Sequence, residues 1–167
     1  MRIEEKIRNE LSYDPHTGIV SWKVGGGRRR VGMEAGWNIH EGYRALEIGG
    51  KSFKTHRVAW LLSFSEWPKN EVDHVNGNKS DNRLANLRDS TREGNCQNAR
   101  IRKNNRSGVK GVSWHEKLQA WRAQIKAGKR CYSLGVYADI SEAAEVVQLA
   151  REMLHGNFAN HGYSRTA

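Results

Sequence analysis

The chain has 167 residues, enough for one ordinary domain or for two to three very small ones. Its hydrophobic fraction of 37% is low for one large core, whereas six tryptophans and regular apolar runs argue against wholesale disorder. The two cysteines lie far apart without a Cys-x-x-Cys spacing, so neither a disulfide framework nor a multi-cysteine zinc site is supported.

The net charge of +10 is concentrated in one segment. Between Arg100 and Arg130, ten lysines and arginines stand against one acid, Glu116, which gives this stretch a charge of +9. A basic segment interleaved with Trp114 and Trp121 is typical of a surface that neutralises phosphates. A solvated face of charged side chains is the alternative. Acidic membrane lipids match less well, because no amphipathic helix carries the charge.

The N-terminal sequence MRIEEKIRNELS contains acids and lacks the apolar stretch of a signal peptide. No run in the chain approaches the length of a membrane span. We therefore expect no membrane association and an intracellular location, in the cytoplasm of a bacterial or phage-infected host.

The first part of the chain predicts short helices and strands. Ile3, Ile7 and Leu11 recur at four-residue spacing, as on one edge of a helix. Gly49-Gly50 interrupts an alternating run, as at the tip of a hairpin. In chain order, the predicted elements are a helix near residues 3–11, a strand at 19–24, a hairpin at 42–53 and a helix at 56–64.

The segment VDHVNGNKSDNRLANLRDS predicts two paired strands joined by a polar loop. The spacing of Ser90 and Glu93 is that of a capping box, so a helix carrying Asn95 should start at about residue 91. The basic run from 99 to 108 has no apolar periodicity and reads as a linker.

Beyond the linker, VKGVSW, AWRAQIK and CYSLGVY predict three short strands. Asp139 and Glu142 form a second capping box, which opens a helix that stops at Gly156. We expect Ala143, Val147, Ala150 and Leu154 to line the buried face of that helix.

The strand-loop-strand-helix segment could bring Asp73 and Asn95 together on one ion. Carboxylate and amide oxygens are hard ligands that suit Mg²⁺ or Mn²⁺. A neutral His74 beside them could take a proton from water, provided that the backbone bends to bring it to the same side. Asn86 could hold the turn that carries His74. An isolated Asp-His pair is nevertheless more often structural, and asparagine-rich loops are usually turns.

The run DHVNGNKSDNRLANLRDSTREGNCQN resembles the His-Asn-His endonuclease motif of the ββα-metal fold, in the form found in phage and intron-encoded homing endonucleases. The resemblance spans roughly residues 56–98. It implies hydrolysis of a DNA phosphodiester with one divalent metal ion, Mg²⁺ or Mn²⁺. It also implies that His74 is the general base, that Asp73 and Asn95 are metal ligands, and that Asn86 orients the histidine loop.

The last motif position is an asparagine here and not a histidine, which keeps an oxygen ligand but makes Asn98 a competitor of Asn95. His56 and Arg57 occupy the place of a similar His-Arg-apolar run in such proteins. We expect them to pack under the site, with phosphate contact as the alternative.

Residues 106–160 resemble the Apetala-type (ethylene-response-factor) DNA-binding domain, with GVKGV, AWRAQI, SLGVY and EAA in order. This resemblance implies that a three-stranded sheet enters the major groove with a helix packed behind it. Alternation along the strand around Trp121 places Arg122, Gln124 and Lys126 on one face, which is expected to meet DNA. Trp114 and Trp121 themselves are expected to be core or sheet-packing residues. Ser133 stands where plant members often carry a tryptophan. The expected DNA contacts there are Lys110, Arg122, Gln124, Lys126 and Arg130.

Two further basic groups are expected to track phosphates. One is the loop Arg28, Arg29 and Arg30, for which a solvated loop is the alternative. The other is the linker with Arg102, Lys103 and Arg106.

The predicted fold class is α+β, in a small modular chain. The expected parts are an N-terminal β-rich, DNA-contacting region (1–55), a ββα-metal nuclease core (56–99), a basic linker (100–107) and an Apetala-like domain of three antiparallel strands and a helix (108–163). Residues 1–55 either fold independently or complete the nuclease core.

These parts predict a site-specific, metal-dependent homing endonuclease on double-stranded DNA. One site per chain favours a monomer that nicks one strand. The alternatives are a DNA-binding regulator with an inactive nuclease core and a structure-specific nuclease of repair or packaging.

Overall fold

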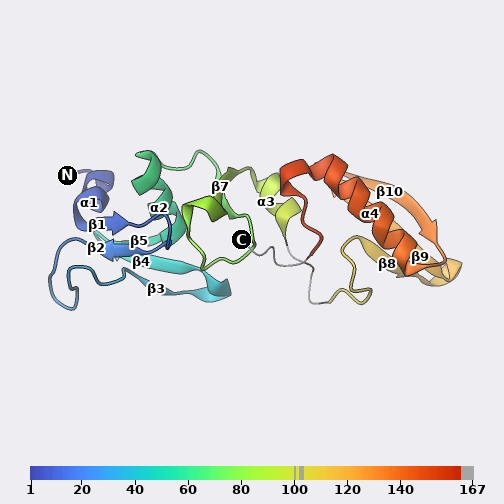
Figure 1. Ribbon diagram of the computed structural model, residues 1–167, viewed down its shortest axis with the longest axis horizontal. Coiled ribbons are helices and arrows are strands. Elements are labelled where there is room, and N and C mark those ends of the chain that lie inside the picture. Colours follow the sequence, from blue (N-terminus) through green and yellow to red (C-terminus); the bar gives the residue numbers. More distant parts are fainter. Residues whose placement is uncertain (100, 102–103, 163–167) are drawn as a thin grey trace. The chain divides into compact units, whose positions relative to one another are not determined.

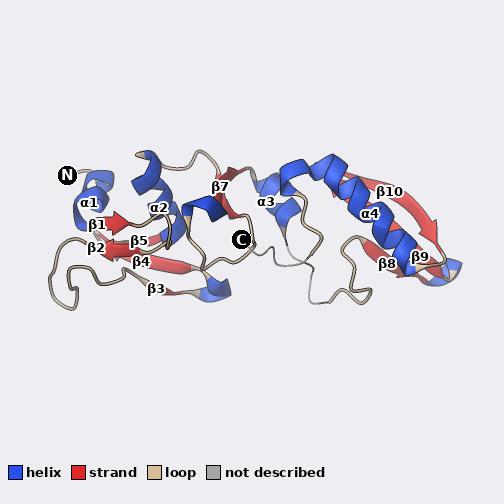
Figure 2. Ribbon diagram, viewed as in Figure 1, coloured by secondary structure: helices blue, strands red, loops and turns tan. Residues whose placement is uncertain are grey.

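A computed structural model describes residues 1–99, 101 and 104–162 of the chain (Figure 1). It divides into two compact units, Met1–Ser90 and a second that begins at Thr91. Each unit combines helices with antiparallel strands, which confirms the predicted α+β class (Figure 2). No helix among the described residues is long and apolar enough to cross a membrane.

The first unit contains two antiparallel hairpins and one three-stranded sheet ordered β3-β4-β5. The hairpins pair β1 with β2 and β6 with β7. Its elements are α1 Ile3–Glu10, β1 Leu11–Tyr13, β2 Val20–Trp22, β3 Trp37–Asn38, η1 His40–Gly42, β4 Arg44–Ile48, β5 Lys51–Lys54, α2 Thr55–Phe64, β6 Glu71–His74, η2 Leu84–Asn86 and β7 Leu87–Ser90.

One hydrophobic core runs through the whole first unit. Ile7 of α1, Leu46 of β4 and Leu61 of α2 are fully buried, and Val72 and Leu87 of the β6–β7 hairpin belong to the same cluster. Each such side chain contributes about 1.5–3 kcal/mol of burial free energy. The N-terminal residues therefore share one core with the β6–β7 hairpin that carries Asp73 and His74.

The second unit packs α4 across one face of the three-stranded sheet β10-β9-β8 (Figure 1). Ala143 and Val147 of α4 meet Val112 and Ala123 of the sheet. The elements are α3 Arg92–Asn98, β8 Val112–His115, η3 Glu116–Leu118, β9 Ala120–Ala127, β10 Arg130–Tyr137, α4 Ile140–His155 and η4 Gly156–Phe158.

The buried face of α4 differs from the expected one at its C-terminal end. Leu154 is 46% exposed, whereas Arg151 and His155 are buried. The four-residue stripe that begins at Ala143 and Val147 continues through these two polar side chains. Burial is possible because each of them finds an acceptor: Arg151 Nη2 donates to Lys110 O, and His155 Nε2 lies 2.9 Å from Lys126 O.

The two helix caps follow the sequence closely. Asp139 caps α4 and accepts from Ser141 N, as the capping pattern predicts. At α3 the capping residue is Thr91, whose Oγ1 accepts from Gly94 N at 3.2 Å, so the helix begins one residue later than the Ser90 pattern indicates.

Candidate active site

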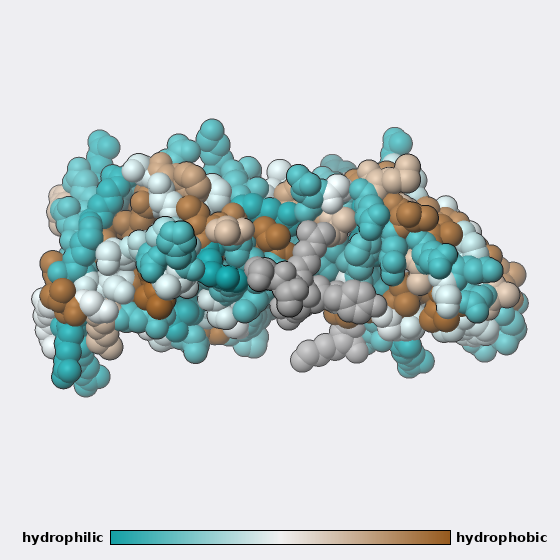
Figure 3. Space-filling model, viewed as in Figure 1, coloured by the Kyte–Doolittle hydropathy of each residue, from teal (hydrophilic) through white to brown (hydrophobic). Residues whose placement is uncertain are grey.

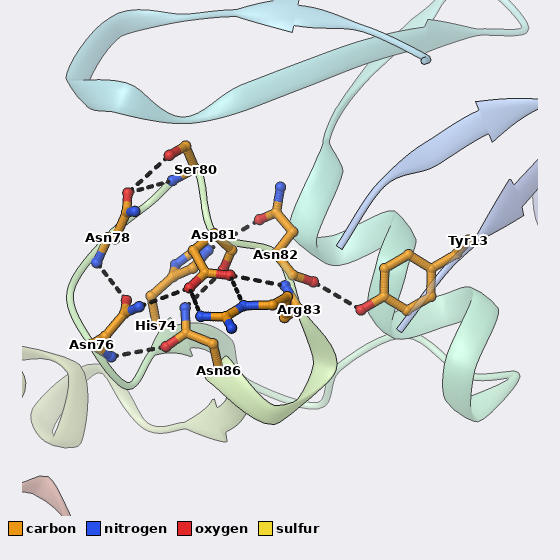
Figure 4. A network of polar contacts seen from close by, with 9 residues as sticks. All are labelled: Tyr13, His74, Asn76, Asn78, Ser80, Asp81, Asn82, Arg83 and Asn86. Carbon is orange, nitrogen blue, oxygen red and sulfur yellow. Dashed lines mark hydrogen bonds and ion pairs between the residues drawn. The ribbon is translucent and has the colours of Figure 1, made fainter. Parts of the chain in front are cut away.

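The polar loop between β6 and β7 holds the candidate active site. The two strands pair antiparallel, with Asp73 opposite Arg88 and His74 opposite Leu87. Asp73 and His74 are 5% and 3% exposed. The loop folds back on itself through asparagine and aspartate side chains, which Figure 4 shows around His74.

His74 is held by an amide of this loop. Its Nε2 lies 3.1 Å from Oδ1 of Asn82, a buried residue that sequence reasoning did not single out. With Nε2 donating to this oxygen, the basic lone pair of the neutral ring belongs to Nδ1. Burial lowers the pKa of His74, although the Asn82 hydrogen bond opposes that shift. The imidazole is therefore neutral at neutral pH.

Asn86 ties the two ends of the loop together. Its Oδ1 accepts from the backbone N–H of Asn76 at 2.9 Å, and its Nδ2 donates to the carbonyl of Asp81 at 2.7 Å. The backbone of Val75 also donates to Asn86 O. The side chain thus fixes the turn that directly follows His74, while the contact to the imidazole itself comes from Asn82 (Figure 4).

A bidentate ion pair stiffens the middle of the loop. Arg83 Nε and Nη2 lie 2.8 and 2.7 Å from the two carboxylate oxygens of Asp81. Asn76 Nδ2 donates to the same carboxylate at 2.8 Å. The Arg83 hydrogen bond is the main cause that lowers the pKa of Asp81 to about 2, so this carboxylate stays charged.

The N-terminal hairpin supports this loop from outside. Tyr13 Oη donates to the carbonyl of Asn82 at 2.8 Å, and Leu84 N donates to Pro15 O at 3.0 Å. A Cβ added at Gly18 would lie 2.5 Å from Arg83 N, so the turn and the loop touch backbone to backbone. Residues far apart in the sequence thus position Asn82.

A cluster of aromatic and basic side chains flanks His74. The His56 ring stands edge-on to that of His74, with centroids 5.1 Å apart, and the Tyr43 centroid lies 6.0 Å from it. The ammonium groups of Lys54 and Lys79 lie 4.3 and 4.6 Å from the centre of the Tyr43 ring. Two cations therefore flank Tyr43, and one of them, Lys79, also pairs with Glu41 at 2.8 Å. Tyr43 and Lys79 carry no spacing signal in the sequence that would have marked them.

Asp73 is paired with a guanidinium. Arg88 Nε and Nη2 both donate to its Oδ2, at 2.9 and 2.7 Å. A carboxylate offers about four lone-pair positions, so an ion can bind it while Arg88 remains bound. No group of three or more His, Cys, Asp or Glu side chains among residues 1–99, 101 and 104–162 is arranged to hold a metal. An ion at Asp73 would thus need amide, water or phosphate oxygens, which suits Mg²⁺ or Mn²⁺.

Asn95, the expected partner of Asp73, lies on α3 in the second unit. Asn98 lies on the same helix and is buried, where its Oδ1 and its backbone carbonyl accept from Asn160 Nδ2. Asn98 is thereby engaged within the second unit. That Asn98 binds a metal ion in place of Asn95 remains a hypothesis, as does the role of Asn95 as a metal ligand.

The expected DNA-contacting residues fall into two groups. Ala123 and Ile125 of β9 are buried against α4, and alternation along the strand puts Arg122, Gln124 and Lys126 on the opposite face. Hydrophilic side chains cover much of the surface shown in Figure 3. The exposed members among the described residues are Arg28, Arg29, Arg30, Arg106, Arg122, Lys126 and Arg130. Arg102 and Lys103 lie outside the described residues.

Two expected contacts have partners inside the protein. The Arg29 guanidinium lies 4.0 Å from the centre of the Trp22 ring and pairs with Glu10. The Lys110 ammonium donates to the carbonyls of Gln97, Ala99 and Asn160, which uses all three of its N–H groups. This geometry favours a structural role for Lys110.

Trp114 and Trp121 pair across the sheet. Their rings are T-shaped with centroids 5.0 Å apart, and Trp121 packs against the α4 core. For Trp121 this is the expected packing role. Trp114 is 43% exposed.

The sequence profile described as HNH endonuclease matches residues 53–97. Over 110 residues the chain is 31% identical to "Protein 3.8" of Escherichia phage T7, and the matched segment spans 65% of this chain and 90% of the relative. The chain belongs to the family of this phage protein. No solved structure matches it significantly. Its HNH endonuclease domain contains β6, the polar loop, β7 and most of α3, and so includes Asp73, His74, Asn82 and Asn86.

Proposed function

We propose that the protein is a site-specific DNA endonuclease of the homing type, which hydrolyses a phosphodiester with one divalent metal ion. The observation that carries this proposal is the buried imidazole of His74, hydrogen-bonded to Asn82 and next to Asp73 in the sequence of the HNH domain. The proposed general base and acidic ligand are thus consecutive residues at the end of β6.

In this mechanism His74 takes a proton from the attacking water at Nδ1. Burial keeps the ring neutral before the step, and the Asn82 oxygen accepts from Nε2–H and stabilises the imidazolium that forms. Asn86 holds the loop turn so that the ring does not swing away. The Lys79 and Lys54 ammonium groups beside Tyr43 are placed to attract the phosphate.

Asp73 and Asn95 would hold the ion, Mg²⁺ or Mn²⁺, which supplies positive charge for the leaving oxygen. Arg88 fixes the Asp73 carboxylate through Oδ2. The DNA would be held by the exposed basic face of β9 and by Arg28, Arg30, Arg106 and Arg130.

The direct test incubates the purified protein with end-labelled phage and host DNA fragments, with Mg²⁺, with Mn²⁺ or with EDTA, and resolves both strands on denaturing gels. Discrete cuts that require the metal ion are expected. With one HNH domain per chain, we expect a nick in one strand by a monomer. Equal cutting of both strands by a complex that sediments as a single protein chain on DNA would contradict the nicking proposal.

A second candidate is a DNA-binding regulator with an inactive nuclease core. The Asp73–Arg88 ion pair favours it, because a guanidinium already neutralises the expected ligand. This candidate predicts sequence-dependent DNA binding without cleavage in any metal ion.

A further inference from the structure

The second unit contains a cavity of about 480 Å³ that plays no part in the proposed cleavage. It lies among α3, the β9–β10 turn and the C-terminal half of α4, and most of its wall surface is apolar. Its volume falls within the range of about 300–1,000 Å³ that is usual for small-molecule sites.

The charge around this cavity is strongly positive. Five lysines and arginines line it against one acid, Glu93. Three of the five, Arg92, Lys126 and Lys129, are exposed at the protein surface. Arg151 is fully buried and braced by Lys110 O and His161 Nδ1, so its positive charge is fixed beside the wall.

One polar atom beside the cavity lacks a partner. His155 contributes to the wall, and while its Nε2 is bonded to Lys126 O, its Nδ1 is buried without a hydrogen-bond partner. Such an atom is uncommon in native proteins. Because Nε2 faces a carbonyl, Nδ1 of the neutral ring is an acceptor that an N–H donor of a ligand would satisfy.

A ligand that fits these features has a largely apolar body with an N–H donor and carries an anionic group. A nucleotide has this chemistry, since its base packs on apolar walls and its phosphate binds arginine and lysine. We propose that the cavity binds a nucleoside monophosphate, either free or as a nucleotide extruded from DNA, with the phosphate at Arg92 and Lys129. The choice of a nucleotide over other anions rests on the proposed action on DNA.

The two cysteines provide a direct readout of occupancy. Cys96 lines the cavity, whereas Cys131 is exposed on β10 outside it. The full-length protein in EDTA is alkylated with iodoacetamide, and the modification rate of each cysteine is followed by peptide mass spectrometry. The probes are deoxynucleoside monophosphates, the matching nucleosides, inorganic phosphate and uncleaved duplex DNA.

A deoxynucleoside monophosphate is expected to slow alkylation of Cys96 in a saturable way, by about tenfold at ten times its dissociation constant, and to leave Cys131 unchanged. Additional protection by duplex DNA would identify the extruded nucleotide as a source, and protection by the free nucleotide without any by DNA would identify the free ligand. Lys129→Glu should weaken nucleotide affinity by about tenfold. Lys117→Glu, an exposed charge reversal outside the cavity, should leave it unchanged.

Several outcomes would overturn the proposal. Equal protection of Cys96 by inorganic phosphate would show that the cavity does not recognise the base. Protection by duplex DNA alone would show that bound DNA only covers the surface around Cys96. Equal loss of affinity in the Lys117 and Lys129 variants would reduce it to long-range charge attraction. Cleavage has no part in this measurement, so failure of the nuclease proposal and failure of the nucleotide site are separately visible.

Discussion

At the residue scale, the proposed chemistry depends on how His74 is oriented. The sequence places Asp73 and His74 side by side, and the structure adds Asn82 as the residue that contacts the imidazole. Asn86 contacts the backbone on either side of the turn instead. The two asparagines therefore have separable roles, one toward the ring and one toward the loop.

Replacing Asn82 with alanine should lower single-turnover DNA cleavage by about 10- to 100-fold, the usual effect of losing a group that orients an active-site side chain. The pH profile should shift as well, because the Asn82 hydrogen bond raises the pKa of His74. Its loss lowers that pKa, so the acidic limb of the profile should move to lower pH. Asn78→Ala removes an exposed amide of the same loop and is the control; equal profiles in both variants would contradict the role of Asn82.

His56 makes the first unit sensitive to acid. Burial, followed by the charge of His74, lowers the pKa of His56 to about 3. The unfolded chain therefore binds a proton between roughly pH 6.5 and pH 3 that the folded protein does not. Stability should fall as pH falls through this window, by up to about 1.4 kcal/mol per pH unit from this group. Denaturant unfolding should show a shallower pH slope in His56→Gln than in wild type, and an unchanged slope would contradict the assignment.

At the element scale, the β1–β2 turn supports the loop of the candidate active site. Gly18 has a φ of +78° and meets the backbone of Arg83, next to Asn82. Gly18→Ala should therefore displace the loop and lower both stability and cleavage. Gly32→Ala is the matched control, since its φ is +80° but an added Cβ there meets nothing within 4 Å. Backbone strain alone costs about 1 kcal/mol in both variants. Any further loss of stability in Gly18→Ala measures the contact between Gly18 and the Arg83 backbone.

Lys110 anchors the C-terminal end of α3. Because its ammonium satisfies three carbonyls, Lys110→Met should destabilise the second unit by about 1–3 kcal/mol. Arg122→Ala, at an exposed position on β9, should weaken DNA binding without this loss of stability. Thermal unfolding and DNA-binding titrations of both variants separate the structural role of Lys110 from the DNA-binding role of Arg122. A Lys110→Met protein that is as stable as wild type but fails to bind DNA would contradict the structural role.

The sequence predicts these elements well where the signal is local. Helix spacing at Ile3 and Ile7, the Gly49-Gly50 tip and the Asp139 cap each depend on residues a few positions apart. The buried Arg151 and His155 were missed because their acceptors are distant in the sequence: Lys110 O lies in the turn before β8, and Lys126 O lies in β9. Asn82 was missed for a related reason, since its position depends on the fold of the whole loop.

At the scale of the whole molecule, the chain is two units with different tasks. The first unit builds one core from the N-terminal residues and the β6–β7 hairpin, and so supplies a rigid support for His74. The second carries a basic sheet face and the cavity beside α3 and α4. We expect the affinity for DNA to fall with increasing salt, because contacts to phosphates release counterions. The proton transfer proposed at His74 is expected to stay the same.

The most direct test of the central claim compares single-turnover DNA cleavage by wild type, His74→Ala and His16→Ala, with DNA binding measured in parallel in EDTA. His16 is exposed, and its side chain takes no part in the site described above. We predict that His74→Ala binds DNA like wild type but cleaves it about 10²- to 10⁴-fold more slowly, the usual contribution of a general base, while His16→Ala cleaves normally. Unchanged metal-dependent cleavage by His74→Ala would contradict the assignment of His74 as the general base.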